Sequence, residues 1–153
     1  MKHATTKLII QHLEYCGFTV EDTSGKGDTY DHLTATHPHS PNLQVYNNEN
    51  EIIFLRASFG LYPAECIGAM TMEANKINAS TILTKWRTCS DEDSGKTLIG
   101  IAACQCGYEK RSFAAMLDLF QAECRNNLPS FQQFTEQNKA LVWKSAPAEN
   151  KAE

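Results

Sequence analysis

The chain has 153 residues, of which 42% are hydrophobic and 21% are charged, and its formal net charge is −4. These values are typical of a globular protein with a single domain. The net negative charge and the scattered basic residues argue against a broad surface for nucleic acid or for an anionic membrane, because such surfaces need clustered Lys and Arg. The longest apolar run, Leu98–Cys104, is far shorter than the roughly 20 residues that cross a membrane.

The N-terminal segment lacks the continuous apolar stretch of an export signal, because Gln11 and His12 follow directly after Leu8–Ile10. We therefore expect a cytoplasmic protein whose six cysteines stay reduced. The cysteines are spread along the chain, without the close spacing of a disulfide scaffold.

The first predicted element is a helix from about His3 to Cys16, which Gly17 ends. Four predicted strands follow, at residues 18–21, 30–37, 43–46 and 51–59. Within the last of them, Ile52–Leu55 is apolar at every position, which indicates a central strand with both faces covered.

A central helix is predicted from about Ala64 to Asn78. Its buried stripe consists of five residues at helical spacing: Cys66, Ile67, Met70, Ala74 and Ile77. Asn78 is expected to end the helix in the left-handed conformation. We interpret Asn75 and Asn78 as a structural motif that caps this helix and ties its end to the next strand. The alternative is that they hydrogen-bond a partner or a substrate.

Two further strands, 80–89 and 97–106, are predicted on either side of an acidic turn, and helices are predicted at 109–126 and 130–144. The order α-β-β-β-β-α-β-β-α-α predicts an α+β fold with an antiparallel sheet of about five to six strands flanked by helices. We expect one domain over residues 1–144 and a flexible tail over 145–153.

Three segments carry a resemblance to a known family: Gly17–Val20 after the first helix, Glu73–Asn78 at the end of the central helix, and Tyr108 with Phe113 at the start of the next helix. With the order of elements, they resemble the YbjN-like family of bacterial proteins, whose fold is akin to that of type III secretion chaperones. The resemblance covers most of residues 3–126. It implies a regulatory or chaperone-like module that binds other proteins and often dimerises.

The chain shows no catalytic constellation and no cofactor motif. We therefore expect a non-enzymatic module that acts as a homodimer and binds a protein partner. We expect it to bind neither nucleic acid nor a membrane. The expected mechanism is burial of an apolar surface against the partner. Four candidate contact residues are Trp86, Ile99, Ile101 and Phe134.

Cys104 and Cys106 place two thiols on one face of a predicted strand, and we expect both to be buried structural residues. The alternative function is a small metal- or redox-responsive regulator that uses this pair, together with His37 or His39. The spacing differs from the C-x2-C of structural zinc sites, and no second cysteine pair follows. Pro38 and Pro41 favour a turn in this segment, so we expect its histidines to be solvated turn residues.

Overall fold

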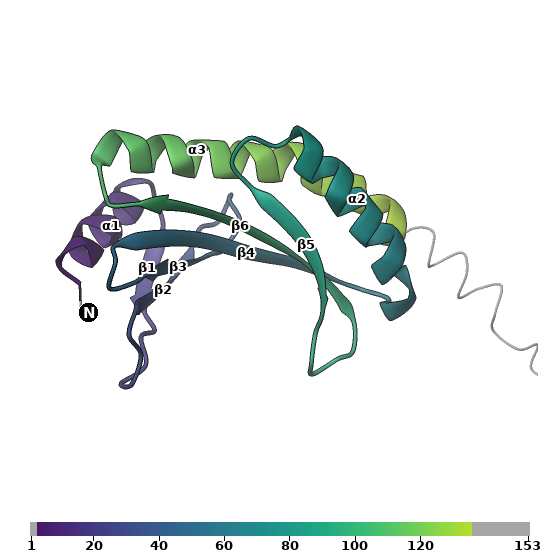
Figure 1. The fold of residues 1–153 in the computed structure, drawn as a ribbon, viewed down its shortest axis with the longest axis horizontal. Helices are drawn as coiled ribbons and strands as arrows, with labels where there is room; N and C mark the ends of the chain where they lie inside the picture. The colour runs from purple at the N-terminus through teal and green to yellow at the C-terminus, as the bar shows by residue number, and fades with distance from the viewer. Residues whose placement is uncertain (1–2, 136–153) are drawn as a thin grey trace, which may run out of the picture.

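The computed structural model describes residues 3–135 and contains a six-stranded antiparallel sheet in the order β1-β2-β3-β4-β6-β5 (Figure 1). The elements, in chain order, are α1 (Ala4–Tyr15), β1 (Thr19–Asp22), β2 (Asp31–Thr36), β3 (Leu43–Asn47), β4 (Ile52–Tyr62), the 3₁₀ turn η1 (Ala64–Cys66), α2 (Ile67–Ser80), β5 (Lys85–Ser90), β6 (Thr97–Cys106), α3 (Lys110–Asn127) and the 3₁₀ turn η2 (Leu128–Phe131). The predicted α+β class is confirmed. The predicted tail and most of the predicted helix 130–144 lie outside the described residues.

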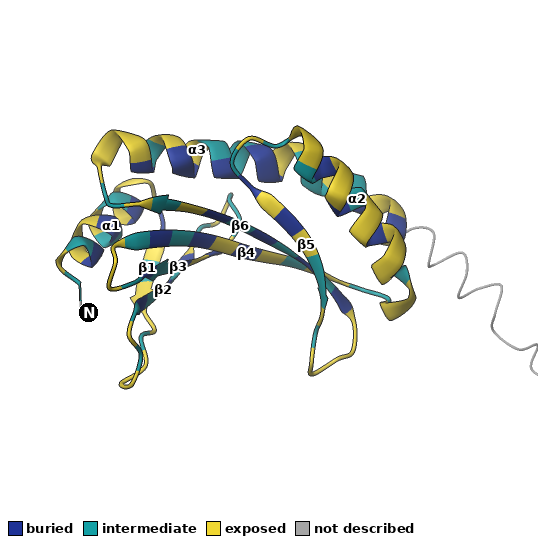
Figure 2. Cartoon of the chain, in the orientation of Figure 1, coloured by how far each residue is buried: buried dark blue, intermediate teal, exposed yellow. Residues whose placement is uncertain are grey.

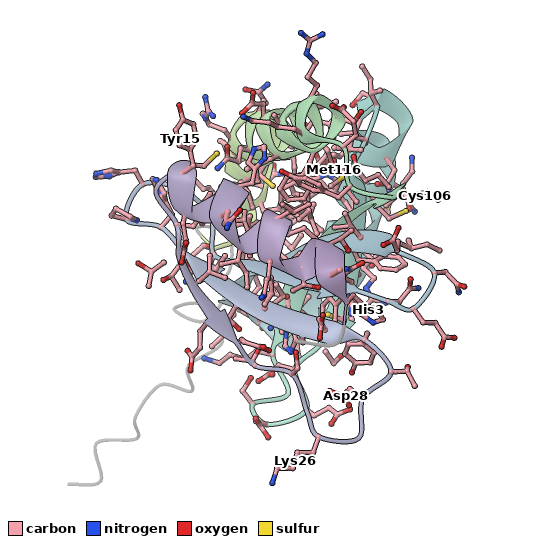
Figure 3. All side chains as sticks on the ribbon, turned by 90° about the vertical axis from the view of Figure 1, so that its left-hand side faces the viewer. His3, Tyr15, Lys26, Asp28, Cys106 and Met116 are labelled. Carbon is pink, nitrogen blue, oxygen red and sulfur yellow. The ribbon has the colours of Figure 1, made fainter. Side chains whose placement is uncertain are left out.

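The core lies between one face of the sheet and the three α-helices, which all lie on the same side (Figures 1 and 2). The strand register aligns the apolar side chains of that face, since Val45 pairs with Leu33 on one side and with Leu55 on the other, and Leu55 pairs with Ala103. Alternate strand residues point to opposite faces, so this register collects one apolar layer. All four side chains are buried.

Strand β4 is central in the sheet, between β3 and β6, but the prediction that both its faces are covered was wrong. Ile53 and Leu55 are fully buried beneath the helices, whereas Ile52 and Phe54 are only half-buried on the opposite face. Every described helix packs on the same side of the sheet, so no described helix covers the opposite face of β4. A run of apolar residues does not show which face of a strand the helices will cover.

Two predicted boundaries also differ from the structure. β4 continues through Gly60 to Tyr62, with an irregularity in its pairing between Phe59 and Tyr62, instead of breaking at Gly60. β5 begins at Lys85 and not at Ser80, because α2 extends to Ser80 and a short loop follows it.

Helix α1 is attached to the sheet through its N-terminal turn. The buried carboxylate of Asp31 on β2 accepts hydrogen bonds from the backbone N–H of His3 at 2.9 Å and from the hydroxyl of Thr6 at 2.6 Å. The side-chain amide of Asn47 on β3 also donates to the hydroxyl of Thr6, at 3.1 Å. A carboxylate satisfies the free N–H groups of a helix start and interacts favourably with its dipole, so Asp31 caps α1 from a distant strand.

Candidate functional site

The face of the sheet opposite the helices carries no helix of the described chain, and we call it the open face. In Figure 1 the β1–β2 and β5–β6 connections both extend from the sheet on this side, away from the helices. Between them lies an open hollow of about 860 Å³, lined by residues of β3, β4, β5 and β6 and of the segment before β2. We take this hollow as the candidate site, because concave surfaces are where ligands and partner segments usually bind.

The floor of the hollow is formed by two small residues of β6, Gly100 and Ala102. Gly100 pairs with Ser58 of β4 and with Arg87 of β5, while Ala102 pairs with Arg56 of β4 and with Lys85 of β5. Longer side chains on β4 and β5 therefore flank a line of small residues on β6. The result is a trough that follows β6.

Three basic residues line this trough, Arg56, Lys85 and Arg87, and no Asp or Glu lines it, although the chain as a whole is acidic. All three are exposed, and within residues 3–135 none of them forms an ion pair or a side-chain hydrogen bond. Basic residues that are scattered in the sequence are thus gathered on one surface. Such a surface attracts negatively charged groups.

The two arginines are held in place by contacts other than ion pairs. The guanidinium of Arg56 lies over the ring of Tyr46, with its central carbon 5.6 Å from the ring centroid. Arg87 lies across Gly100, since a Cβ atom at that glycine would be 3.5 Å from both Cγ and Nε of the arginine. The arginine side chain therefore lies within ordinary contact distance of the Gly100 backbone.

Tyr46 is itself fixed by its neighbours on β2 and β3. The ring of His32 stacks flat against it, with centroids 4.4 Å apart and an interplanar angle of 3°, and Tyr30 meets it edge-on at 5.6 Å. The hydroxyl of Tyr46 donates to the side-chain oxygen of Gln44 at 3.2 Å. This cluster of rings supports Arg56 from one side of the hollow.

The fold matches a solved structure. A crystal structure described as "YbjN, a putative transcription regulator from E. coli" aligns with a TM-score of 0.62 and 14% sequence identity, over 83% of this chain and 90% of that chain. At this identity the match shows a shared fold alone, so the predicted relationship in fold is confirmed, while membership of the family and the link to secretion chaperones stay predictions. No protein-family model and no curated protein sequence matches the chain.

The four residues that we predicted to contact a partner all lie inside the chain's own core: Trp86, Ile99, Ile101 and Phe134. Trp86 is 2% exposed; its ring stacks parallel to that of Phe131 at 5.9 Å, and its Nε1 donates to the hydroxyl of Thr84 at 2.8 Å. These side chains are occupied by intramolecular packing.

Asn78 bridges α2 and β5 with both groups of its side chain. Its Nδ2 donates to the carbonyl of Trp86 at 2.8 Å, and its Oδ1 accepts from the backbone N–H of the same residue at 2.7 Å. The expectation that Asn78 ends the helix in the left-handed conformation was wrong, because α2 continues to Ser80 and leaves through an extended Thr81. Asn75 is exposed on the same helix.

Cys104 and Cys106 were predicted to be buried, but both are exposed. The reason is register, because Ala103 of the same strand points into the core while its even-numbered neighbours point to the open face. Within residues 3–135 no group of three or more His, Cys, Asp or Glu side chains could hold a metal ion. The backbone N–H of His39 donates to Nδ1 of His37 at 2.9 Å, which is a contact within the predicted turn.

A second, smaller hollow of about 440 Å³ lies between α1 and α3 and contains His12, Cys16 and Asp118. Desolvation lowers the pKa of His12, with Lys110 acting in the same direction, and its Nδ1 lies 3.1 Å from the hydroxyl of Tyr108. Burial, together with the nearby Asp118, raises the pKa of the Cys16 thiol. Both shifts favour the neutral forms of the two side chains.

None of the helices in the described range has both the length and the apolar composition that a membrane crossing requires.

Sequence reasoning missed the residues that define the hollow. The only signal was alternation: basic residues at Lys85 and Arg87, and small residues at Gly100 and Ala102, each two positions apart. The pairing of β5 with β6 was needed to join these two patterns.

Proposed function

We propose that the protein is a non-enzymatic, regulatory or chaperone-like module that binds a partner protein on its open face. The observation that carries this proposal is the trough along β6, over which no described helix lies; Arg87 lies across Gly100, and Ala102 lines the hollow beside it. Small residues on a sheet allow another chain to approach the backbone closely. The regulatory role is supported by the description of the E. coli protein with the same fold.

The proposed mechanism is burial of the floor and flanks of the trough beneath a segment of the partner. Phe54, half-buried on the open face, supplies an apolar contact beside the floor, and the arginines supply polar ones. A central apolar contact surrounded by polar groups is the usual anatomy of a specific interface.

The test is to block the floor without changing the charge. Ala102→Trp places a large side chain in the trough, whereas Ala115→Trp, on the exposed surface of α3, is the matched control. Each variant is immobilised and used to capture proteins from an extract of the source organism, with mass-spectrometric quantification. We expect the same proteins to be captured by the native chain and by Ala115→Trp, and lost with Ala102→Trp.

Equal capture by both tryptophan variants would contradict the proposal, provided that both keep the native melting temperature. A protein captured by the native protein and by both tryptophan variants binds elsewhere on the molecule. Loss of capture by Ala115→Trp alone would move the binding surface to the helical side.

We also propose that the protein forms a homodimer through the region around α2. Three of its large exposed apolar residues are Leu61, at the end of β4, Met72, on α2 and 66% exposed, and Ile82, which follows α2 and is 85% exposed. Contiguous exposed apolar surface favours self-association, and we propose that these three residues contribute to such a surface. Light scattering should give twice the chain mass for the native protein and for Leu8→Glu, an exposed apolar position on α1, and a single chain mass for Met72→Glu. A single chain mass for the native protein at high concentration would rule the dimer out.

A further inference from the structure

The chemistry of the trough specifies the kind of partner segment that it would hold. We propose that this segment is acidic and extended, and that Arg56 and Arg87 bind its carboxylates; the inference rests on the proposed function and adds the chemical class of the partner. Its basis is the charge of the trough, which has three basic residues, no acidic ones and no ion pair among the described residues.

Contacts within the protein already orient the side chains of the two arginines before a partner binds. Arg56 is stacked on Tyr46, which is in turn clamped by His32, and Arg87 rests across Gly100. A guanidinium group that is already held in place loses less conformational entropy on binding than a free surface side chain. Such groups bind carboxylates through paired hydrogen bonds.

The spacing of the cations matches an extended segment that follows β6. Arg56 stands on one side of Ala102 and Lys85 on the other, so cations flank the trough on both sides. Lys85 and Arg87 are two positions apart on β5, which corresponds to a rise of about 7 Å. Acidic residues at alternate positions of an extended partner segment have the same repeat. An extended segment with alternating Glu or Asp would therefore present its carboxylates in register with the cations.

Single-stranded nucleic acid is the other anionic polymer that binds to open sheets, and the site fits it less well. Such proteins stack bases on free aromatic rings and follow the backbone with many basic residues. Here the ring of Tyr46 is already stacked with His32 and lies beneath Arg56.

The experiment measures the binding of a fluorescent peptide in which Glu alternates with Ala, at low and at physiological salt. The same peptide with Gln in place of Glu and an oligothymidylate of matched length are the comparison probes. The protein variants are Arg56→Gln/Arg87→Gln and the control Arg111→Gln/Arg125→Gln, which removes two exposed arginines from α3 on the opposite side. Circular dichroism confirms that both double variants keep the native fold.

We expect the Glu peptide to bind more tightly than the Gln peptide, and Arg56→Gln/Arg87→Gln to weaken its binding about tenfold, as the loss of two surface ion pairs predicts. The control variant should change the affinity less than about twofold, and salt should weaken the binding. Equal binding of the Glu and Gln peptides, equal losses in the two double variants, or tighter binding of the oligothymidylate would each overturn the inference. If Ala102→Trp still abolishes partner capture in those cases, the proposed function stands and only the acidic nature of the partner falls.

Discussion

The carboxylate of Glu123, near the end of α3, accepts a hydrogen bond from the backbone N–H of Thr84 at 2.8 Å, in the loop between α2 and β5. The same carboxylate accepts from the backbone N–H groups of Ile82 at 2.8 Å and Leu83 at 3.3 Å, and from the Thr84 hydroxyl. That hydroxyl also receives the indole N–H of Trp86. One buried side chain thus accepts hydrogen bonds from three consecutive backbone N–H groups of the loop. Through Thr84 and Trp86 it also joins the loop to the edge strand that carries Lys85 and Arg87.

Glu123→Ala should therefore destabilise the protein strongly. The substitution leaves two buried donors of Thr84, its backbone N–H and its hydroxyl, and two part-buried backbone N–H groups without their acceptor. We expect a loss of about 3 kcal/mol in the free energy of unfolding. Urea denaturation measures this loss, and Glu14→Ala, at an exposed position on α1, should change stability by less than about 0.5 kcal/mol. A loss below about 1 kcal/mol with Glu123→Ala would mean that water replaces the carboxylate at the loop.

The same carboxylate should make stability depend on acid pH. Burial alone raises the pKa of Glu123, but the hydrogen bonds from Thr84, Ile82 and Leu83 together outweigh it and hold the pKa below its ordinary value. A depressed pKa in the folded state contributes stability above the unfolded value, about 4.3, and this contribution is lost as the pH falls through the folded value. Between neutral pH and about pH 3, the native protein should lose more unfolding free energy than Glu123→Gln. Parallel pH profiles for the two proteins would argue against this assignment.

The cysteines should react in the order of their exposure. Burial, with the neighbouring Glu123, raises the pKa of the Cys124 thiol to about 12, whereas Cys104 and Cys106 are exposed. Because the thiolate is the reactive form, iodoacetamide should modify Cys104 and Cys106 in the folded protein and Cys124 only after denaturation. Peptide mass spectrometry of samples taken over time gives the order. Early modification of Cys124 would show that the packing around α3 opens readily.

Gly60→Ala should destabilise the end of β4 more than Gly95→Ala destabilises the turn before β6. Both glycines have a left-handed backbone, with φ of 75° and 69°, but a Cβ atom at Gly60 would lie 2.1 Å from the ring of Tyr62, whereas Gly95 has open space. We expect about 1 kcal/mol for Gly95→Ala from backbone strain and a larger loss for Gly60→Ala. The double variant Gly60→Ala/Tyr62→Ala should lose less unfolding free energy than the sum of the losses in the two single variants. Strict additivity would indicate that the ring of Tyr62 moves aside at no cost.

The sequence predicted the kind and order of the elements well, because these depend on local patterns. The spacing of Phe113, Leu117 and Phe120 indicates a helix with one apolar face, and α3 buries all three. The boundaries that failed depend on distant contacts. The loop before β5 is held by Glu123, which lies about forty residues further along the chain, and no local signal marks it.

The candidate site could not be predicted for a similar reason. The residues that face the hollow come from separate strands, and alternation within a strand does not say which face will be covered by helices. Trp86, Ile99 and Ile101 were candidates for a partner surface because they are large and apolar, and the helices bury them. Arg56 lies far from Lys85 and Arg87 in the sequence, so no local cluster of basic residues marks the site.

The sequence by itself therefore determined the α+β class and the strand-forming and helix-forming segments, because hydrophobic spacing and turn residues act over a few positions. Only the tertiary structure decided that β6 lies between β4 and β5, that all described helices cover one face, and that Gly100 and Ala102 are left on the other. These outcomes depend on which strands pair and in which register. A shift of one residue would exchange the buried and the open face, and the energy that selects the register comes from burying the whole apolar layer at once.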